Sequence, residues 1–597
     1  MRRRPSVLVA AALAASVVGL TGCTESVEGT TPVGTLTPPG PTASTATAAA
    51  PSERPLVVET VFGQVDLDPG QAFSRTGAII SRALYQTLTT LSAQDETQAE
   101  AGLAQYTISP EGKWLTLRLR ADATFSDGTP VTTDDVIFTL NRAAGLGGLP
   151  ATILGNLRMT KVDERTMTIT SPSANFALPA ILANPAFGIL NSSAVKAQGG
   201  TIGPNDFAGP WLQTHSAGSG PYVLAARTTG TVTLRANPHW NGPPPAHPEI
   251  VLRDATAAEQ VRDLEAGRAD IALDVSPSQA EAIQLDPADR ALRVVTRRSA
   301  TTAYLVLNTS AKVNRWTADP DFAEAVRRGL DSAALAKLVG GGTIAAPGLI
   351  PQGIFGALKP AATNPAPAPT PSGSAGASGT PPPSGAAPAP TATPFPASPS
   401  ASLPRPTMTT PTARPRTMDG RDLAAAKAAL KRAGYTGEPL TLHYAEEQPI
   451  EGVPAKLLAE AVARQLGEAG ITVHPEGIAA ADARSAYEKG TEAFALWSFT
   501  PAFPGPENYL LFAPGHPIGL HAGWPLRAAT VVDELTIQAL NSVGEDRRAT
   551  YTSWQRAMNT AGPFVPLVQP ASHYAYGSRV TALSTNPIWT IDLAQTR

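Results

Sequence analysis

The sequence predicts an α/β protein with more than one sheet, because strand-type and helix-type patterns alternate along the chain. Leu115, Leu117 and Leu119 alternate with polar residues, which is the pattern of a half-buried strand. The segment 304–308 begins with four consecutive apolar residues, 304–307, which is typical of a buried strand. At 597 residues the chain is too long for a single domain of about 150 residues. We therefore expect two lobes, each built around a sheet.

Helices are predicted between these strands from their end signals. Thr132 and Asp135 form a capping box before an apolar helical face. A helix is expected to begin at Thr256 and to end at Gly267, and Asp319 should cap another. Two further predicted helices end at glycines, which are Gly434 and Gly470.

The first 22 residues have the pattern of a secretory signal. Three arginines precede the short apolar run from Ser6 to Leu20, which is too short to span a bilayer comfortably. The residues Leu20-Thr21-Gly22-Cys23 resemble a bacterial lipobox, and this resemblance implies that Cys23 carries a lipid after cleavage. An ordinary buried cysteine after an ordinary signal peptide is the alternative. The lipid-anchored reading predicts an extracytoplasmic protein attached to the cell membrane, with no later segment that spans it.

Composition excludes several other classes of protein. Cys23 is the only cysteine, so internal disulfides and multi-thiolate zinc sites are excluded. The formal net charge of −3 does not favour nucleic acid as a partner. Residues 23–55 read as a flexible stalk, and 359–416 form a proline-rich tract inside the folded region. This tract is either a surface-loop insertion or a partner-binding segment.

The sequence lacks the common motifs of enzyme chemistry. The histidines show no His-Glu-x-x-His pattern, and we find neither a phosphate-binding loop nor a nucleophile elbow. Asp134 and Asp135 are read as helix-capping residues rather than as a catalytic carboxylate pair. The segment from Gly218 to Pro221 is read as a turn before a strand. We therefore expect no enzyme activity, no cofactor and no metal.

Several blocks of the sequence, in order, resemble the family 5 extracytoplasmic solute-binding proteins of ABC importers, the group with the oligopeptide and dipeptide binders. The most specific block reads Phe125-Ser126-Asp127-Gly128-Thr129-Pro130, and it lies within 114–142. The other blocks include Leu67-Asp68-Pro69, Gly218-Ser219-Gly220-Pro221-Tyr222, Asn237-Pro238-His239-Trp240, Leu264-Glu265-Ala266-Gly267 and Phe564-Val565-Pro566-Leu567.

This resemblance implies a two-lobed periplasmic-binding-protein-like α/β fold, type II, cluster C, with an extra subdomain inserted in the first lobe. The implied segments are 56–90, 208–308 and 564–597 for the first lobe, 91–207 for the inserted subdomain, and 309–563 for the second lobe. It also implies a small-molecule or peptide ligand, bound between lobes that close on it, and an ABC permease and ATPase as partners. We expect a monomer.

The sequence departs from the family at the position that binds the ammonium group of a peptide. The dipeptide and oligopeptide binders place an aspartate a few residues after a tryptophan. Counting from Trp497 puts Thr500 at this position, and counting back from Pro506 puts Ala502 there. Neither carries a charge, and a buried ammonium without a carboxylate is unfavourable. Glu507 is a possible substitute, although its place in the motif indicates a surface turn.

The candidate ligand-binding residues come from three parts of the chain. They are Phe73, Arg75, Tyr304, Trp497, Phe499, Thr500, Ala502 and Phe503. For the aromatic residues among them, a place in the core of a lobe is the alternative. The function expected from these features is solute capture for an ABC importer. The alternative is a non-transporting envelope lipoprotein that uses the same scaffold for regulation, scaffolding, or lipid or glycan binding.

Overall fold

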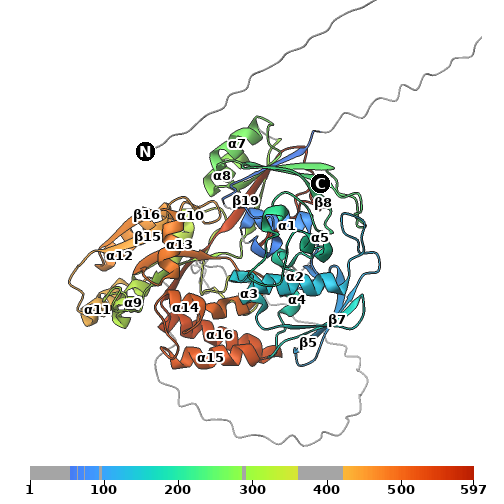
Figure 1. Cartoon of the computed structure of the whole chain (residues 1–597). Coiled ribbons are helices and arrows are strands. Elements are labelled where there is room, and N and C mark those ends of the chain that lie inside the picture. Colours follow the sequence, from blue (N-terminus) through green and yellow to red (C-terminus); the bar gives the residue numbers. More distant parts are fainter. Residues whose placement is uncertain (1–53, 64, 73, 93–96, 286–290, 361–420) are drawn as a thin grey trace, which may run out of the picture. The chain divides into compact units, whose positions relative to one another are not determined.

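The computed structural model describes residues 54–63, 65–72, 74–92, 97–285, 291–360 and 421–597. The predictions for the signal segment, Cys23, the stalk, Phe73 and nearly all of the proline-rich tract fall outside these described residues. Within the described ranges, the chain forms sheets of seven, six and four strands together with two short strand pairs (Figure 1). No helix in these ranges is long and apolar enough to cross a membrane.

The seven-stranded sheet combines segments from the beginning, middle and end of the described chain. Its strands, in spatial order, are β12 (Arg293–Arg298), β19 (Ala571–Tyr576), β11 (Ile271–Val275), β1 (Leu56–Thr60), β10 (Glu249–Asp254), β9 (Thr231–Ala236) and β8 (Tyr222–Thr228). The central strand β1 is parallel to both of its neighbours, and the outer pairs are antiparallel. One face packs on helix α1 (Arg75–Leu84), and the other face packs on α7 (Ala257–Glu265) and α8 (Pro277–Leu285).

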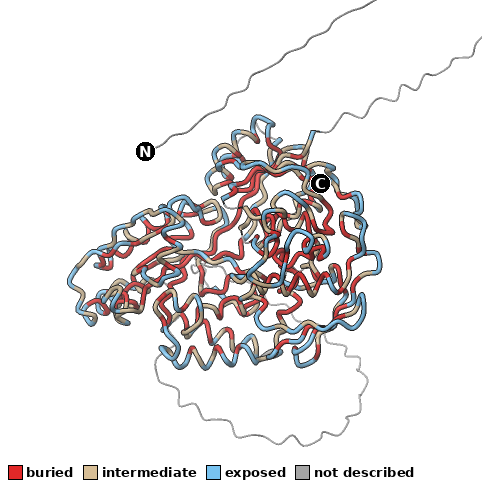
Figure 2. Tube along the Cα trace, in the orientation of Figure 1, coloured by how far each residue is buried: buried red, intermediate tan, exposed pale blue. Residues whose placement is uncertain are grey.

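The six-stranded sheet is covered by helices on both faces, and its inner strands are buried (Figure 2). Its strands, in spatial order, are β14 (Ile344–Ala345), β18 (Phe564–Gln569), β13 (Thr302–Leu307), β17 (Phe494–Phe499), β15 (Leu440–Ala445) and β16 (Val473–Ile478). Four helices cover one face: α9 (Pro320–Gly329), α10 (Ser332–Val339), α11 (Leu423–Ala433) and α12 (Ala455–Ala469). The other face packs on α15 (Thr530–Asn541), α16 (Gly544–Ala561) and the 3₁₀ helix η3 (Pro506–Phe512).

The two large sheets are joined where β12 leads into β13 and where β18 leads into β19. These connections lie side by side, because the Ser299 amide donates to the Pro570 carbonyl (3.2 Å) and the Gln569 side chain donates to the Ser299 carbonyl (2.7 Å). The change of sheet therefore falls at 299–301 and at Pro570. The predicted segment ends at 308 and 563 instead group β13 and β18 with the seven-stranded sheet. Both strands are buried on both faces, so their continuous apolar sequences do not indicate which sheet they join.

The four-stranded antiparallel sheet belongs to the chain between β1 and β8. Its spatial order is β4 (Ala104–Ile108), β5 (Trp114–Leu119), β7 (Thr166–Thr170) and β6 (Arg158–Lys161), and helix α2 (Thr133–Gly145) packs on it. The predicted capping box at the start of α2 is confirmed, because the Asp135 carboxylate accepts hydrogen bonds from the Thr132 amide (2.9 Å) and hydroxyl (2.7 Å).

An interior ion cluster ties this four-stranded unit to the segment that follows β1. The guanidinium of Arg142, on α2, donates to the Asp68 carboxylate at 2.8 and 2.6 Å and to the Asp206 carboxylate at 2.8 Å. All three side chains are at most 2% exposed. Asp68 also caps a short 3₁₀ helix through the Gly70 amide. This double use of one carboxylate is a physical reason for the Leu67-Asp68-Pro69 block.

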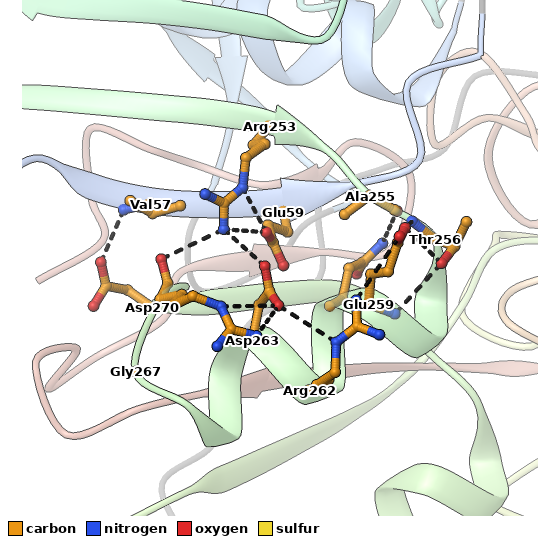
Figure 3. Close-up of polar contacts among 12 residues, drawn as sticks. Val57, Glu59, Arg253, Ala255, Thr256, Glu259, Arg262, Asp263, Gly267 and Asp270 are labelled. Atoms are coloured by element: carbon orange, nitrogen blue, oxygen red, sulfur yellow. Dashed lines mark hydrogen bonds and ion pairs between the residues drawn. The ribbon is translucent and has the colours of Figure 1, made fainter.

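The remaining predicted helices form close to their predicted ends. Helices α11 and α12 stop at Gly434 and Gly470, both with positive φ. Helix α7 begins with a capping box, in which the Glu259 carboxylate accepts from the amide (2.9 Å) and the hydroxyl (2.8 Å) of Thr256. Figure 3 shows this cap together with Arg253 of β10, which donates to Asp263 of α7 at 3.1 Å and so holds the helix against the sheet.

Candidate binding site at the junction of the two sheets

Arg75 is the first residue of helix α1 and lies beside the seven-stranded sheet. Its guanidinium donates to the Asp274 carboxylate (2.9 Å), the Leu273 carbonyl (3.1 Å) and the Thr590 hydroxyl (3.0 Å). Burial disfavours the charged form of this side chain, but the carboxylates of Asp274 and Glu451 outweigh that effect and raise the pKa of Arg75. Arg75 is thus a fixed cation whose charge is balanced mainly by Asp274.

Glu451 connects the six-stranded sheet to both chain segments that join the sheets. It lies on the loop between β15 and α12, and its carboxylate accepts hydrogen bonds from Ser299 (3.0 Å), Thr301 (2.7 Å) and Ser572 (2.6 Å). Ser299 and Thr301 precede β13, and Ser572 lies on β19. We call Glu451 and these three hydroxyl residues the junction cluster. Sequence analysis did not single out any of its four members.

The backbone has an unusual conformation at Glu451, where the loop approaches the seven-stranded sheet. Glu451 has φ 51°, which is uncommon for a residue other than glycine. The next residue, Gly452, has φ 77°, and a Cβ atom there would lie 2.8 Å from the Val275 carbonyl of β11. Only glycine fits this approach without movement of the backbone. The unusual backbone of Glu451 therefore directly precedes the point where the loop lies closest to β11.

Thr500 joins the junction cluster from the end of β17. Its hydroxyl lies 2.7 Å from the Thr301 hydroxyl, and its side chain is otherwise exposed. Of the predicted ligand-binding residues, Arg75 on α1 packs on the seven-stranded sheet and Thr500 follows β17 of the six-stranded sheet, and both are linked to Glu451. Arg75 is coupled to it by charge, and Thr500 is coupled to it through Thr301.

The predicted aromatic residues of the six-stranded sheet lie together on one of its faces. Tyr304 and Trp497 are cross-strand partners, and Phe499 follows on the same face. Tyr304 is 2% exposed and packs edge-on against Phe512 and Phe564, and burial raises its pKa well above the usual value. It is a core residue in this structure. Trp497 and Phe499 are half-buried at the margin of the same core.

Ala502 and Phe503 face the four-stranded unit rather than the junction cluster. Phe503 is 4% exposed and is part of the apolar core around α2. The Ala502 carbonyl accepts a hydrogen bond from the Asn184 side chain (2.6 Å), and the Ala502 amide donates to Asn508 (2.9 Å). The chain that follows β17 therefore bridges the six-stranded sheet and the four-stranded unit.

Glu507 has a partner of its own at the start of η3. Its carboxylate forms an ion pair with Arg547 of α16, and that guanidinium also lies over the rings of Phe355 and Tyr551. Because its charge is already balanced by Arg547, Glu507 is not available as an uncompensated carboxylate for a ligand.

A hollow of about 950 Å³ lies on the four-stranded unit, between the start of α2 and the helix at 192–197. None of the predicted ligand-binding residues lines it. Of its carboxylates, Asp135 caps α2, and Asp134 pairs with Lys161 at 2.7 Å. These acidic groups already have structural roles. The hollow is lined by residues of the four-stranded unit and its neighbours, whereas the junction receives side chains from both large sheets. Within the described residues, no group of three or more metal-binding side chains is present.

The profile of the bacterial extracellular solute-binding proteins, family 5, middle region, matches residues 98–516. The chain belongs to this family. A curated relative described as a probable D,D-dipeptide-binding periplasmic protein, from Escherichia coli strain K12, is 28% identical over 272 residues, which are 44% of this chain. The chain spans about half the length of this relative, 51%.

Solved structures of other substrate-binding proteins share the fold of the described residues. The ABC transporter substrate-binding protein CtaP from Listeria monocytogenes gives a TM-score of 0.70 at 16% identity, covering 91% of this chain and 99% of its own. The protein DppA from Helicobacter pylori, solved with a bound peptide, gives 0.67 at 17% identity, covering 90% and 96%. The fold is therefore the two-lobed, periplasmic-binding-protein-like α/β fold. The matched proteins are binding proteins of ABC transporters and not enzymes.

Proposed function

We propose that this family 5 protein captures a peptide-like or other small solute between its two lobes and delivers it to an ABC permease and ATPase. The observation that carries the proposal is that Thr500 contacts Thr301, a hydrogen-bond donor to Glu451, while Arg75 lies near enough for the charge of Glu451 to raise its pKa. Arg75 belongs to the lobe of the seven-stranded sheet, and Thr500 belongs to the lobe of the six-stranded sheet. A solute held by both residues stabilises the closed arrangement of the lobes, since it loses its contacts with one lobe when they separate.

Peptide-like ligands are proposed on the basis of the relatives. One curated relative is described as a dipeptide-binding protein, and one solved neighbour contains a bound peptide. Two-lobed proteins that close on a ligand use backbone and side-chain donors from both sides, which suits an extended peptide. The absence of an aspartate at Thr500 and Ala502 sets this chain apart from the family pattern that the sequence resembles.

The proposal is tested by measuring the Tm of the purified protein in the presence of each member of a panel of solutes. A ligand that binds only the folded protein at 100 times its Kd stabilises it by about 2.7 kcal/mol. We expect an increase in Tm with di- to tetrapeptides or related amines, and no increase with unrelated sugars at the same concentration. An unchanged Tm across the whole panel contradicts solute capture and favours the non-transporting lipoprotein.

The lipid anchor at Cys23 belongs to the same proposal and has a separate test. Mass spectrometry of the mature protein from membranes should find the amino terminus at Cys23 with a diacylglyceryl group and an acyl chain. Two or more chains give stable attachment, whereas one is marginal. The Cys23→Ser variant should leave the membrane fraction, while Ser26→Ala, three residues later, should stay attached. An unmodified wild-type terminus contradicts the anchor without bearing on solute capture.

A further inference from the structure

A turn of three consecutive glycines from one lobe packs against a strand of the other lobe. Gly340, Gly341 and Gly342 connect α10 to β14 of the six-stranded sheet, and all three have positive φ, at 70°, 57° and 84°. A Cβ atom at Gly341 would lie 2.6 Å from Nε2 of His573, on β19 of the seven-stranded sheet, and 2.9 Å from Cβ of Pro277 on α8. Only glycine allows the turn to lie this close to the His573 ring.

The imidazole of His573 is buried and has a hydrogen-bond partner at only one of its two nitrogens. The residue is 2% exposed, and its Nδ1 lies 3.0 Å from the Thr296 hydroxyl of β12. Its Nε2, which lies next to Gly341, has no hydrogen-bond partner among the described residues. A neutral imidazole fits this arrangement, because it has a single N–H group and the Thr296 hydroxyl can accept it at Nδ1.

Protonation of His573 adds a second N–H group to the ring. Both nitrogens then carry a hydrogen, and the one at Nε2 lies against the glycine turn, where the described part of the chain offers it no acceptor. A buried charged donor without an acceptor is unfavourable. Movement of the turn away from His573 admits water to Nε2 and removes this cost.

No neighbouring charge offsets the burial of His573. Burial alone lowers the pKa of this side chain below its ordinary value of about 6.5. Side chains alternate between the faces of β12, so Arg298 shares the face of Thr296, whereas Arg293 and Arg297 lie on the other face. The charged residues on the elements beside or against this face of β19 are Arg298 of β12, Asp274 of β11, Glu281 of α8, Lys337 of α10, and Glu259, Arg262, Asp263 and Glu265 of α7.

Strand β19 is contacted by the other lobe on both of its faces. Ser572 and His573 are neighbours on this strand, so their side chains point to opposite faces. Ser572 donates to Glu451 on the loop after β15, and His573 meets the turn after α10. Both contacts lie next to Pro570, where the chain passes from one sheet to the other. Rotation of the lobes about the connecting segments therefore moves the glycine turn relative to His573.

We propose that His573 and the glycine turn at 340–342 form a pH-sensitive contact between the two lobes, in which the turn packs on the neutral imidazole and is released when the imidazole is protonated. This inference goes beyond solute capture, because it concerns the arrangement of the lobes when no solute is bound. The packed contact lowers the pKa of His573, so the contact is stable above about pH 6.5 and weakens as the pH falls. The ratio of released to packed protein should rise by up to about tenfold for each pH unit below 6.5, which is the limit for one linked proton.

The test measures the distance between the lobes as a function of pH. Because Cys23 is the only native cysteine, Cys23→Ser combined with Ala226→Cys on β8 and Glu460→Cys on α12 allows one nitroxide label on each lobe, at exposed positions. Pulsed electron paramagnetic resonance then gives the distribution of label distances at pH 7.5, 6.0 and 5.0, without any solute. Circular dichroism and the Tm show whether each variant is folded.

Two pairs of variants isolate the contact in this labelled protein. His573→Gln removes the titrating group, and His474→Gln is its control at an exposed histidine of β16. Gly341→Ala places a Cβ atom against the His573 ring. Gly340→Ala is its control, because it imposes a similar backbone cost, at φ 70°, but its Cβ atom would meet nothing within 4 Å.

We expect the distance distribution of the labelled protein to shift as the pH falls from 7.5 to 5.0, with most of the shift below pH 6.5. His474→Gln should shift in the same way, and His573→Gln should not shift. Gly341→Ala should show at pH 7.5 the distribution that the parent protein reaches at pH 5.0. Gly340→Ala should keep the parent distribution at pH 7.5.

Three results would overturn the inference. A parent distribution that is the same at all three pH values excludes a pH-sensitive contact between the lobes. An equal shift in His573→Gln assigns the response to other titratable groups. Equal distributions in the two glycine variants at pH 7.5 show that the turn does not restrain the lobes. If His573→Gln does not fold, the pH series of the parent and the glycine pair still decide the question, and none of these measurements depends on solute binding.

Discussion

Buried and half-buried charges in this protein are stabilised by individual partner residues. Arg142 is enclosed by two carboxylates, those of Asp68 and Asp206, and none of the three side chains is in appreciable contact with solvent. Loss of one member of such a group leaves the others charged and without a partner in a medium of low dielectric. By contrast, Glu451 is only half-buried, so hydrogen bonds from neutral donors and partial solvation stabilise its charge without a counter-ion.

Replacement of Arg142 should be severely destabilising. We expect Arg142→Met to lower the free energy of unfolding by about 3–5 kcal/mol, because Asp68 and Asp206 remain buried without a counter-ion. Urea unfolding followed by circular dichroism measures the change. Arg158→Met, at an exposed position of β6, should change it by less than about 0.5 kcal/mol. Similar losses in the two variants would contradict the role assigned to the buried cluster.

Helix caps and ion pairs, as well as apolar faces, position individual helices. Helix α7 starts at a capping box and is held to β10 by Arg253, as Figure 3 shows. Because α7 covers the face of the seven-stranded sheet away from α1, its first turn affects how well that sheet is shielded.

Removal of the Thr256 hydroxyl should weaken α7. Thr256→Ala eliminates the side-chain half of the capping box and should lower the free energy of unfolding by about 1 kcal/mol. Thr256→Ser keeps the hydroxyl and should be close to neutral. The two variants are compared by chemical denaturation under identical conditions, and a loss in Ser equal to that in Ala would show that the methyl group, not the cap, matters.

Sequence patterns predicted the elements far better than they predicted the candidate site. The capping box at Thr132 was recognisable because its two partners, Thr132 and Asp135, lie three residues apart. The hydroxyl partners of Glu451 lie 152, 150 and 121 residues away along the chain, so no local pattern announces them. Arg75 and Thr500 were selected for their places in the chain, but their connection through Glu451 emerges only from the arrangement of the two sheets.

At the scale of the whole molecule, contacts near the end of β17 join the six-stranded sheet to the four-stranded unit. Phe503 leaves the end of the six-stranded sheet and enters the core around α2, and Asn184 holds the neighbouring Ala502 carbonyl. These contacts couple the lobe of the six-stranded sheet to the inserted four-stranded unit. They lie close in sequence to Thr500, so movement at this bridge also moves one side of the junction cluster.

Truncation of Phe503 should loosen the bridge. Phe503→Ala should lower the free energy of unfolding by about 3–5 kcal/mol through lost burial and the resulting cavity. Amide exchange around 177–187 should become faster, which distinguishes loss of the bridge from a general loss of stability. Phe207→Ala, at a side chain 72% exposed, is the matched control and should change neither quantity appreciably. Unaltered exchange in Phe503→Ala would contradict the proposed coupling.

The pairing of the two connections limits how the lobes can move. The Gln569 amide nitrogen binds the Ser299 carbonyl and the Gln352 carbonyl, at 2.7 and 3.0 Å, so both crossings pass through one small region of the molecule. Because both connecting segments are bound to Gln569, one lobe can rotate relative to the other about this region, but it cannot be displaced along it. In the proposed solute capture, the two halves would therefore separate most at the margin farthest from Gln569.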